Sequence, residues 1–298
     1  MEYGDKHILV LGAGASGIGA SWVLAQVGAH VVLNDYKPVT LPATEEGRLV
    51  SAGVEIITGR QDESLLDGVD RIVISPGISL DIPIVKAAQA RGIDVVSEVE
   101  LAYEVSKSPI VAVTGTNGKT TTTTLLTKVL EGSGKPVRVG GNIGDSLSEV
   151  AYSMPVGGFL VAELSSYQLE TIKHFRPIGA IMLNITPDHL ARHKTMENYI
   201  AAKERIFENQ LKSDYLVLNI DDSVVADMEH RAPSHILQIS QKQTVENGAY
   251  YANGQCYVVK NGVATAVIGD EDIHIPGSHN IENILTVIAL TYALGVPV

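Results

Sequence analysis

The stretch VAVTGTNGKTTTT (residues 111–123) decides the fold, because it places a glycine-rich loop between a strand and a helix. An apolar run ends at Thr114, and a helix is predicted from Thr120 to Leu130. Backbone N–H groups in such a turn can hold phosphates, Lys119 can offset their charge, and the hydroxyl of Thr120 can ligate Mg²⁺. The usual pattern G-x-x-x-x-G-K-[ST] needs glycine where this chain has Val113. The stretch is therefore either a variant phosphate loop or a tight turn with a solvated lysine.

The helix after this loop begins with five consecutive threonines, residues 120–124. Threonine is a poor residue for a helix interior, because its branched side chain loses rotamer freedom there. We therefore expect packing to stabilise the helix through a buried face made of Leu125, Leu126, Val129 and Leu130.

The first hundred residues alternate short β-branched runs with helical stretches. The runs are HILVL (7–11), HVVLN (30–34), VEIIT (54–58), RIVIS (71–75) and DVVS (94–97). Strands that are apolar throughout, with helices between them, indicate a parallel sheet covered on both faces. The helical pattern breaks at Lys107-Ser108-Pro109, which we interpret as a linker. We therefore predict a Rossmann-like parallel-sheet domain over residues 1–107.

A second series of strands follows the linker, with PIVAVT (109–114), VRV (137–139), FLVAE (159–163), AIMLN (180–184) and YLVLN (215–219). From about residue 235, three Asn-Gly pairs, at Asn247, Asn253 and Asn261, lie among alternating runs such as CYVV and TAVI. Asn-Gly is the favoured two-residue hairpin turn. The fold class is therefore predicted as α/β, with a central P-loop ATPase-like domain over residues 108–298 that includes a small antiparallel sheet.

The first strand runs into GAGASG (12–17), which fits G-x-G-x-x-G, and Asp35 ends the next strand. In this context glycines let a pyrophosphate approach a helix N-terminus, and the acid meets a ribose or a similar polar group. The alternative interpretation is a turn that only serves helix–sheet packing. The pattern predicts a diphosphate ligand without specifying a nicotinamide.

Composition and charge exclude several classes of function. The chain has 298 residues, 45% of them apolar and 19% charged, as in ordinary globular proteins. A net charge of −12 argues against a nucleic-acid-binding surface. With Cys256 as the single cysteine, no intrachain disulfide is possible. The most apolar stretch, residues 284–298, is too short to cross a membrane. We expect a cytoplasmic protein without membrane insertion.

Polar residues follow several strands of the second series. Asn142 lies in GGNIG, Glu163 ends FLVAE, and His189 follows AIMLN in NITPDH. Ligands of open α/β sheets bind outside the carboxyl ends of the strands, so these side chains are predicted to gather near Lys119. Glu163 offers the hard oxygen that Mg²⁺ prefers. Taken singly, the three residues also fit a turn, a solvated strand end and a helix cap.

These motifs resemble the Mur ligases and the related folylpolyglutamate synthases. TGTNGKTT matches their phosphate loop, which accounts for Val113, and GGNIG, NITPDHLARH, YIAAKERIF and GSHNIEN fit in the expected order. ELSSYQLE (163–170) is more selective and is similar to the branch of Mur ligases that adds D-glutamate. The resemblance covers essentially the whole chain.

The resemblance implies an ATP-dependent ligase of peptidoglycan precursor synthesis. Such an enzyme joins D-glutamate to UDP-MurNAc-L-Ala through an acyl phosphate, with ATP and Mg²⁺ as cofactors. It implies UDP-substrate binding by residues 1–107 and ATP binding by residues 108–298. Family members carry a further C-terminal, amino-acid-binding domain that we expect to be absent here. By that expectation the chain is a fragment, inactive in the full reaction, and a monomer is favoured.

The family's site residues carry over to the second domain by matching motifs. ATP phosphates are expected on Gly115, Thr116, Asn117, Gly118, Lys119, Thr120 and Thr121, and the adenine and ribose beside Asn280 and Asn283. Thr120 and Glu163 would ligate one Mg²⁺, and His189 would help to hold a second. Lys119, His189 and Lys203 are expected to be catalytic, and Asn142 would contact the muramoyl group.

Two further expectations rest only on the resemblance. Lys203 matches a lysine that family members carbamylate, which would make it a metal-binding carboxylate, although the sequence by itself indicates a solvated helical lysine. In the first domain, Ser16, Gly17 and Asp35 would contact the UDP-sugar, and Ser75-Pro76-Gly77 would line the same pocket.

Three other interpretations compete with this one. An alanine-adding Mur ligase also has a Rossmann-like first domain, but ELSSYQLE argues against it. An NAD-dependent oxidoreductase would explain GAGASG and Asp35 and leave TGTNGKTT, Glu163 and His189 unexplained. A non-enzymatic nucleotide-binding switch would not need a second diphosphate-binding domain.

Overall fold

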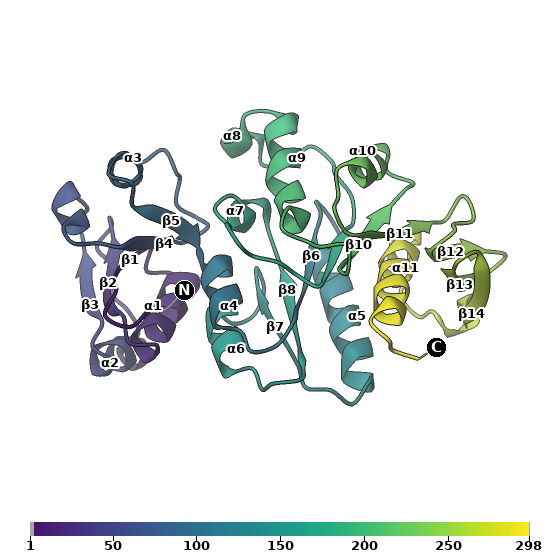
Figure 1. The fold of residues 1–298 in the computed structure, drawn as a ribbon, viewed down its shortest axis with the longest axis horizontal. Coiled ribbons are helices and arrows are strands. Elements are labelled where there is room, and N and C mark those ends of the chain that lie inside the picture. The colour runs from purple at the N-terminus through teal and green to yellow at the C-terminus, as the bar shows by residue number, and fades with distance from the viewer. Residues whose placement is uncertain (1–2, 298) are drawn as a thin grey trace. The chain divides into compact units, whose positions relative to one another are not determined.

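The computed structural model describes residues 3–297, which form two compact units (Figure 1). Unit 1 comprises the chain up to Lys107 together with two later segments, Gly144–Met154 and Tyr167–Phe175. Unit 2 comprises Ser108–Ile143, Pro155–Ser166 and the chain from Arg176 onward. The sequence predicted two continuous domains. In the structure, two segments that follow the linker in the sequence pack into unit 1.

Unit 1 is built on a five-stranded sheet with the strand order β3-β2-β1-β4-β5. All of its pairings are parallel. The elements of the first hundred residues are β1 (His7–Leu11), α1 (Ala15–Gln26), β2 (His30–Asp35), α2 (Ala43–Ser51), β3 (Glu55–Thr58), the 3₁₀ turn η1 (Glu63–Leu66), β4 (Arg71–Ile74), α3 (Pro83–Ala90), β5 (Asp94–Ser97) and α4 (Glu98–Val105).

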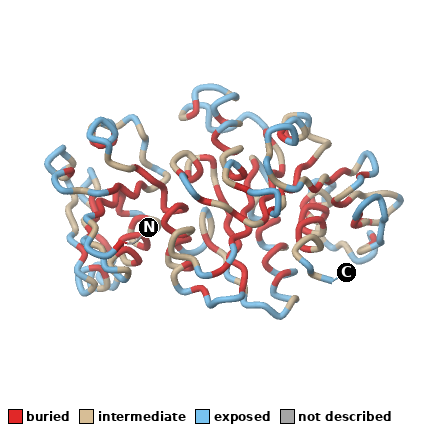
Figure 2. Tube along the Cα trace, in the orientation of Figure 1, coloured by how far each residue is buried: buried red, intermediate tan, exposed pale blue. Residues whose placement is uncertain are grey.

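Both faces of this sheet are buried, which explains its continuously apolar strands. In β1, Ile8 and Val10 pack into one core cluster with residues of α1, α2 and α4, whereas Leu9 and Leu11 pack into another with residues of α3. Alternate side chains of a strand point to opposite faces, so burial on both sides requires an unbroken apolar run. Figure 2 shows the buried residues of each unit in red.

Two buried glutamates of α4 hold the later segments in unit 1. Glu100 accepts hydrogen bonds from the backbone N–H groups of Lys173, His174 and Phe175. Glu98 accepts hydrogen bonds from residues at the beginning of α6 (Leu147–Ser153). Each carboxylate accepts hydrogen bonds from several buried donors, which offsets part of the cost of burying it, although Oε2 of Glu98 has no partner among the described residues.

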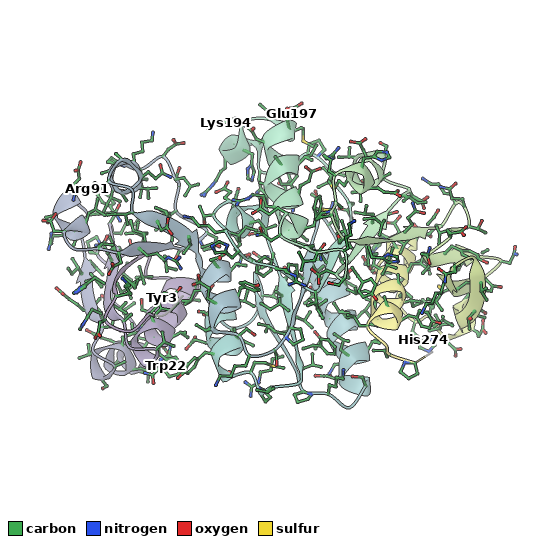
Figure 3. The ribbon with its side chains drawn as sticks, viewed as in Figure 1. Tyr3, Trp22, Arg91, Lys194, Glu197 and His274 are labelled. Atoms are coloured by element: carbon green, nitrogen blue, oxygen red, sulfur yellow. The ribbon has the colours of Figure 1, made fainter. Side chains whose placement is uncertain are left out.

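Unit 1 also contains a buried ion pair that contacts Tyr3, the residue labelled in Figure 3. Arg71 and Glu104 are 2.9 Å apart, and their side chains are 3% and 7% exposed. Tyr3 donates a hydrogen bond to Glu104, and its burial raises the pKa of the phenol. Removing one member alone would leave an unpaired buried charge, so the three side chains act as a unit.

Unit 2 is built on a nine-stranded sheet with the order β14-β13-β12-β11-β10-β9-β6-β8-β7. From β7 to β12 the pairings are parallel, and β12–β13 and β13–β14 are antiparallel. The elements after residue 108 are β6 (Ile110–Thr114), α5 (Lys119–Gly132), β7 (Val137–Gly141), α6, β8 (Phe159–Glu163), α7 (Ser166–Leu169), β9 (Gly179–Met182), α8 (Leu190–His193), α9 (Met196–Glu204), η2 (Arg205–Phe207), β10 (Tyr215–Asn219), α10 (Ser223–Asp227), η3 (Met228–His230), β11 (His235–Ser240), β12 (Gly248–Ala252), β13 (Gln255–Lys260), β14 (Val263–Gly269), η4 (Asp270–Asp272) and α11 (Ser278–Ala293).

The predicted antiparallel strands form the edge of the large sheet. Asn253 and Asn261 take left-handed φ values of 51° in the two hairpin turns, as the Asn-Gly pattern predicts. The expectation fails at Asn247, because Gly248 begins β12, which runs parallel to β11. Gly248 is needed for close packing, since a Cβ there would lie 1.9 Å from the carbonyl oxygen of Gln238.

The helix after the phosphate loop is packed differently from the expectation. Leu126 and Leu130 are buried, but Val129 is 39% exposed, and Thr123 and Thr127 lie inside instead. The Thr127 hydroxyl donates to the carbonyl oxygen of Thr123, a bond to the preceding turn that allows a threonine to be buried in a helix. The hydroxyl of Thr123 itself has no partner among the described residues. None of the helices within residues 3–297 is both long enough and apolar enough to span a bilayer.

Substitution of Gly248 by alanine tests the close pairing of β11 and β12. We expect Gly248→Ala to lower the free energy of unfolding by on the order of 2–3 kcal/mol, because the new methyl group must displace the Gln238 backbone. Urea unfolding followed by circular dichroism measures this loss. Gly132→Ala, at the end of α5 with open space around the new atom, is the control and should be neutral or slightly stabilising.

Candidate nucleotide site

The phosphate loop between β6 and α5 depends on two glycines. Gly115 has a φ of 149°, and a Cβ there would lie 2.9 Å from the Cβ of Leu183. Gly118 has a φ of 83°, and a Cβ there would lie 2.7 Å from Oδ1 of Asn283. Both positions combine left-handed backbone with crowding, so no other residue fits either of them without strain. The resulting turn presents its backbone N–H groups at the N-terminus of α5.

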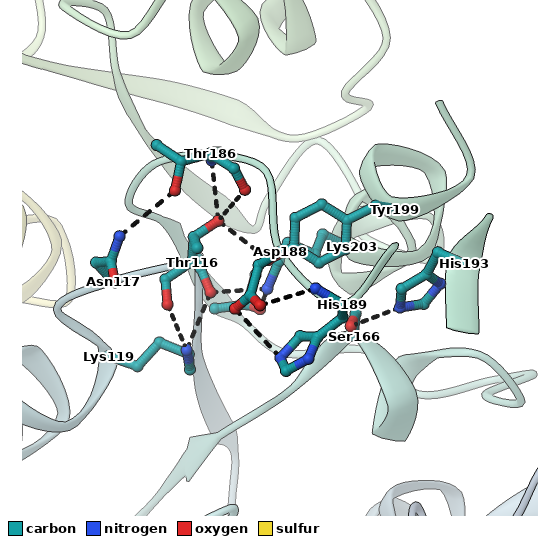
Figure 4. A network of polar contacts seen from close by, with 12 residues as sticks. Thr116, Asn117, Lys119, Ser166, Thr186, Asp188, His189, His193, Tyr199 and Lys203 are labelled. Atoms are coloured by element: carbon teal, nitrogen blue, oxygen red, sulfur yellow. Dashed lines mark hydrogen bonds and ion pairs between the residues drawn. The ribbon is translucent and has the colours of Figure 1, made fainter. Parts of the chain in front are cut away.

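The segment after β9 fixes the loop in place (Figure 4). The N–H of Thr116 donates to the carbonyl oxygen of Asn184, and the N–H of Asn117 donates to its side-chain Oδ1. The hydroxyl of Thr116 bonds to the backbone of Thr186 in both directions, at 3.0 and 3.2 Å. The loop conformation is therefore set by contacts with a strand end distant in sequence.

Two lysine side chains donate to the carbonyl oxygen of Gly115. Nζ of Lys203 lies 2.7 Å from it and Nζ of Lys119 lies 3.2 Å from it, while Lys119 also donates to the carbonyl of Thr116. Burial lowers the pKa of Lys119, opposed by the charges of Glu163 and Asp188. Two amino groups at the start of one helix, at least one of them charged, favour an anionic ligand here.

Lys203 differs most from its sequence-based interpretation as a solvated helical lysine. Its side chain is only 2% exposed. Burial, followed by repulsion from Lys119, lowers the pKa of Lys203 to about 7. At neutral pH a substantial fraction of this amine is therefore unprotonated and nucleophilic.

Glu163 ends β8 beside the loop, as expected from the strand pattern. Its backbone pairs with Val113 of β6, and Oε1 accepts a hydrogen bond of 2.9 Å from the amide of Asn142. The side chain is buried, yet Oε2 has no hydrogen-bond partner among the described residues. An unsatisfied buried carboxylate oxygen is costly unless a ligand satisfies it, and a hard cation fits this donor.

The other predicted metal ligands are less enclosed. His189 has a left-handed φ of 53° at the start of α8, and its half-exposed ring lies 3.3 Å from Asp188. Thr120 is exposed at the start of α5. Within residues 3–297 no three His, Cys, Asp or Glu side chains form a metal-binding group. A metal at this site would need threonine or modified lysine oxygens in addition to Glu163.

Tyr199 of α9, which no sequence motif singled out, contacts several parts of the site. Its hydroxyl lies 3.0 Å from that of Thr116, and its ring centroid lies 5.0 Å from Nζ of Lys203 and 6.4 Å from the ring of His189. His193 packs against the same ring and bonds to Ser166, at 2.9 Å. The spacing of four residues between Tyr199 and Lys203 on one helix was the available signal.

Asn280 and Asn283 lie at the beginning of α11, and both are buried. Asn283 donates to Oδ1 of Asn280 and accepts a hydrogen bond from the hydroxyl of Thr122 in α5. The structure therefore brings Asn283 to the phosphate loop, where it packs against Gly118. Contact of the two amides with adenine or ribose stays a prediction.

Unit 1 carries the other glycine loop. A Cβ on Gly17 would lie 1.8 Å from the carbonyl oxygen of Gly12, so the loop can close only around glycine. Ser75 donates to that carbonyl, and Oδ2 of Asp35 accepts a hydrogen bond of 2.9 Å from the N–H of Ala13. Ser16 lies in the first turn of α1, and Gly77 follows β4. Three segments, each following a strand or ending it, thus contribute to the place predicted for a sugar diphosphate.

Two family models match successive parts of the chain. The Mur ligase middle domain matches residues 113–291, and the N-terminal domain of MurD-like Mur ligases matches residues 6–97. The chain belongs to the Mur ligase family. This confirms the family recognised from TGTNGKTT and the other motifs.

Curated relatives within the Mur ligases are similar over the whole chain. It is 45% identical to the UDP-N-acetylmuramoylalanine–D-glutamate ligase of Thermoanaerobacter pseudethanolicus over 296 residues, covering 99% of this chain and 65% of the relative. Identity is also 45% to the ligase of that name from Caldanaerobacter subterraneus, covering 100% and 65%. The chain thus spans about 65% of the length of these relatives.

Solved structures support the fold of this Mur ligase chain. The UDP-N-acetylmuramate:L-alanyl-gamma-D-glutamyl-meso-diaminopimelate ligase from Neisseria meningitides matches with a TM-score of 0.64 and 23% identity, over 98% of this chain and 94% of that one. At this identity the likeness shows the fold alone. It confirms the predicted α/β class with two parallel sheets and an antiparallel part.

The low pKa of Lys203 predicts a pH dependence of stability. The unfolded lysine, with a pKa of about 10.4, binds a proton that the buried amine releases near pH 7, so stability should rise with pH between these values. In CO₂-depleted buffer we expect a contribution of up to about 1.4 kcal/mol per pH unit between roughly pH 7.5 and 9.5.

Urea unfolding of the chain and of Lys203→Met across this range measures that contribution. The variant should show a flatter profile, whereas Lys128→Met, which changes an exposed lysine of α5, should keep the original slope. Equal slopes in all three proteins would contradict a depressed pKa at Lys203.

Proposed function

We propose that this chain is the sugar-nucleotide- and ATP-binding part of a ligase that joins D-glutamate to UDP-MurNAc-L-Ala in peptidoglycan precursor synthesis. Similarity at 45% identity over nearly the whole chain supports this substrate pair, as does ELSSYQLE at residues 163–170. Because the relatives are longer, we assign the complete reaction to the full ligase.

The observation that carries the proposal is the convergence of groups around the phosphate loop. Lys119 and Lys203 meet at the Gly115 carbonyl, and Glu163 ends the strand beside it with one oxygen unsatisfied. A cationic loop next to a buried acceptor suits a polyphosphate bound together with a cation. The glycine loop of unit 1 offers a second phosphate-binding site, which a sugar-nucleotide substrate requires.

The reaction makes an amide from an unreactive carboxylate in two steps. An oxygen of the alanyl carboxylate attacks the γ-phosphorus of ATP; the new O–P bond forms as the bond to ADP breaks, which gives an acyl phosphate. The D-glutamate amine then attacks the carbonyl carbon, loses a proton, and expels phosphate. The chain positions the reactants and offsets charge, with Lys119 against the phosphates that would otherwise repel the carboxylate.

The donor set also fits Mg²⁺. Glu163 through its unsatisfied oxygen and Thr120 through its hydroxyl would hold one ion, and His189 would help to hold another. A bound ion would supply further charge neutralisation at the phosphates.

Lys203 is suited to carbamylation. Its unprotonated amine can add to the carbon of CO₂ and lose a proton, which converts an ammonium into a carboxylate. That change would remove the repulsion between Lys203 and Lys119 and provide an anionic oxygen ligand at the phosphate loop. Asn142, Asn280, Asn283 and the loop residues from Gly115 to Thr121 keep their proposed roles in ligand binding.

The proposed substrates also suggest where the enzyme works. ATP and UDP-linked precursors are cytoplasmic metabolites, so we propose a cytoplasmic enzyme, with a monomer as the simplest assembly. An NAD-dependent oxidoreductase is the rival that the G-x-G-x-x-G loop favours, and binding experiments separate the two.

Isothermal titration of the chain with UDP-MurNAc-L-Ala, beside NADH, tests the ligand of unit 1. We expect binding of the uridine ligand, weakened roughly tenfold or more by Asp35→Ala, because Asp35 holds the loop through the N–H of Ala13. Asp81→Ala, which changes an exposed carboxylate of the same unit, should leave the affinity unchanged. Binding of NADH alone would favour the oxidoreductase.

Substitution of Lys119 tests the phosphate loop in the full-length ligase. We expect Lys119→Ala to reduce ATP-dependent product formation by at least about 10²-fold, because the transferring phosphate loses its main cationic partner. Lys128→Ala, nine residues later on the exposed side of α5, is the matched control and should retain activity. Near-normal turnover of Lys119→Ala would refute the assignment of this loop.

A further inference from the structure

Glu98 is a buried carboxyl group behind the glycine loop of unit 1. It is the first residue of α4 and is only 1% exposed. Its Oε1 accepts hydrogen bonds from the hydroxyl of Ser146 at 2.5 Å, and from the N–H and hydroxyl of Ser148, both at 2.9 Å. Oε2 of Glu98 has no hydrogen-bond partner among the described residues, and the Ser16 hydroxyl lowers the pKa of this carboxyl group. Counting its own, Glu98 thus connects three segments of the chain.

The three segments are the beginnings of three helices. Ser16 lies in the first turn of α1, Glu98 begins α4, and Ser146 is the N-cap of α6. The partial positive charge at helix N-termini favours a carboxylate. Burial acts in the opposite direction and raises the pKa of Glu98. Burying a carboxyl group at this position therefore costs free energy of folding, which argues that Glu98 has a role beyond general packing.

The same contacts set the position of α1. A Cβ on Gly19 would lie 2.1 Å from Oγ of Ser146, so α1 touches α6 with almost no space between them. Ser16 is half-buried and follows the exposed residues Gly14 and Ala15. Loss of the Glu98 carboxyl would release Ser146, which packs against Gly19, and would remove the charge near Ser16, so the beginning of α1 would lose its support.

We propose that Glu98 is a positioning residue for the sugar diphosphate, holding Ser16 and the first turn of α1 in the conformation that receives this ligand. The inference rests on the proposed function, because it takes the glycine loop as the site of a UDP-linked substrate. Glu98 is buried beneath the loop and acts through Ser16.

Calorimetric titration of the chain with UDP-MurNAc-L-Ala tests this role in three variants. Glu98→Ala should weaken binding roughly tenfold, the scale of one well-placed hydrogen bond. Glu98→Gln keeps an oxygen in the place of Oε1 and should bind within about threefold of the original chain. Glu100→Ala, which removes a buried carboxyl of the same helix that bonds to residues 173–175, should lower thermal stability without changing affinity.

A double-mutant cycle distinguishes positioning from general destabilisation. If Glu98 acts through Ser16, the effects of Glu98→Ala and Ser16→Ala on affinity should be clearly less than additive. If Glu98→Ala does not fold, Ser148→Ala takes its place, since it removes one hydroxyl from the same carboxyl group and should weaken binding about threefold.

The outcomes separate this inference from the proposed function. Suppose the original chain binds the ligand and Glu98→Ala, or its substitute Ser148→Ala, binds with the same affinity. That result would overturn the positioning role alone. Equal losses in Glu98→Ala and Glu100→Ala, or additive effects with Ser16→Ala, would overturn it as well. Absence of binding by the original chain would overturn the proposed substrate and this inference together.

Discussion

The architecture depends on the close approach of two glycine loops to the backbone around them. In each loop a Cβ has no room: at Gly17 it would lie 1.8 Å from a carbonyl oxygen, and at Gly115 it would lie 2.9 Å from Leu183. Because the backbone can come so near, its N–H groups reach the carboxyl edge of each parallel sheet, where a helix begins. The candidate phosphate sites of both units follow from this single steric constraint.

Around the phosphate loop of unit 2, two mutually repelling lysines lie close to a buried carboxylate. Two lysines share the Gly115 carbonyl, and one is buried enough to have a pKa of about 7. Beside them Glu163 keeps an unsatisfied buried oxygen. Such an arrangement costs stability in the isolated protein, and costs of this kind are common at functional sites. Tyr199 holds the arrangement together, because its ring packs on Lys203 while its hydroxyl bonds to the loop.

The two carboxylates of α4 show how a sequence boundary and a structural boundary come to differ. The break at Lys107-Ser108-Pro109 is visible in the sequence, and the first unit's main segment does end at Lys107. Glu98 and Glu100, however, each collect backbone donors from segments beyond it. Hydrogen bonds to a buried carboxylate are specific and strong, so two later segments join unit 1.

The sequence by itself determined the class of fold and predicted the kind of ligand. Strand spacing, apolar runs buried on both faces and two glycine motifs require only local geometry, and Glu163 could be placed because parallel strands end at one edge. Tertiary structure decided what depends on distant neighbours: the burial of Lys203, the part played by Tyr199, the exposure of Val129 and the pairing of Gly248. A lysine on a helix has the same local pattern whether it faces water or a phosphate loop. Only the packing around it sets its solvation, and therefore its charge.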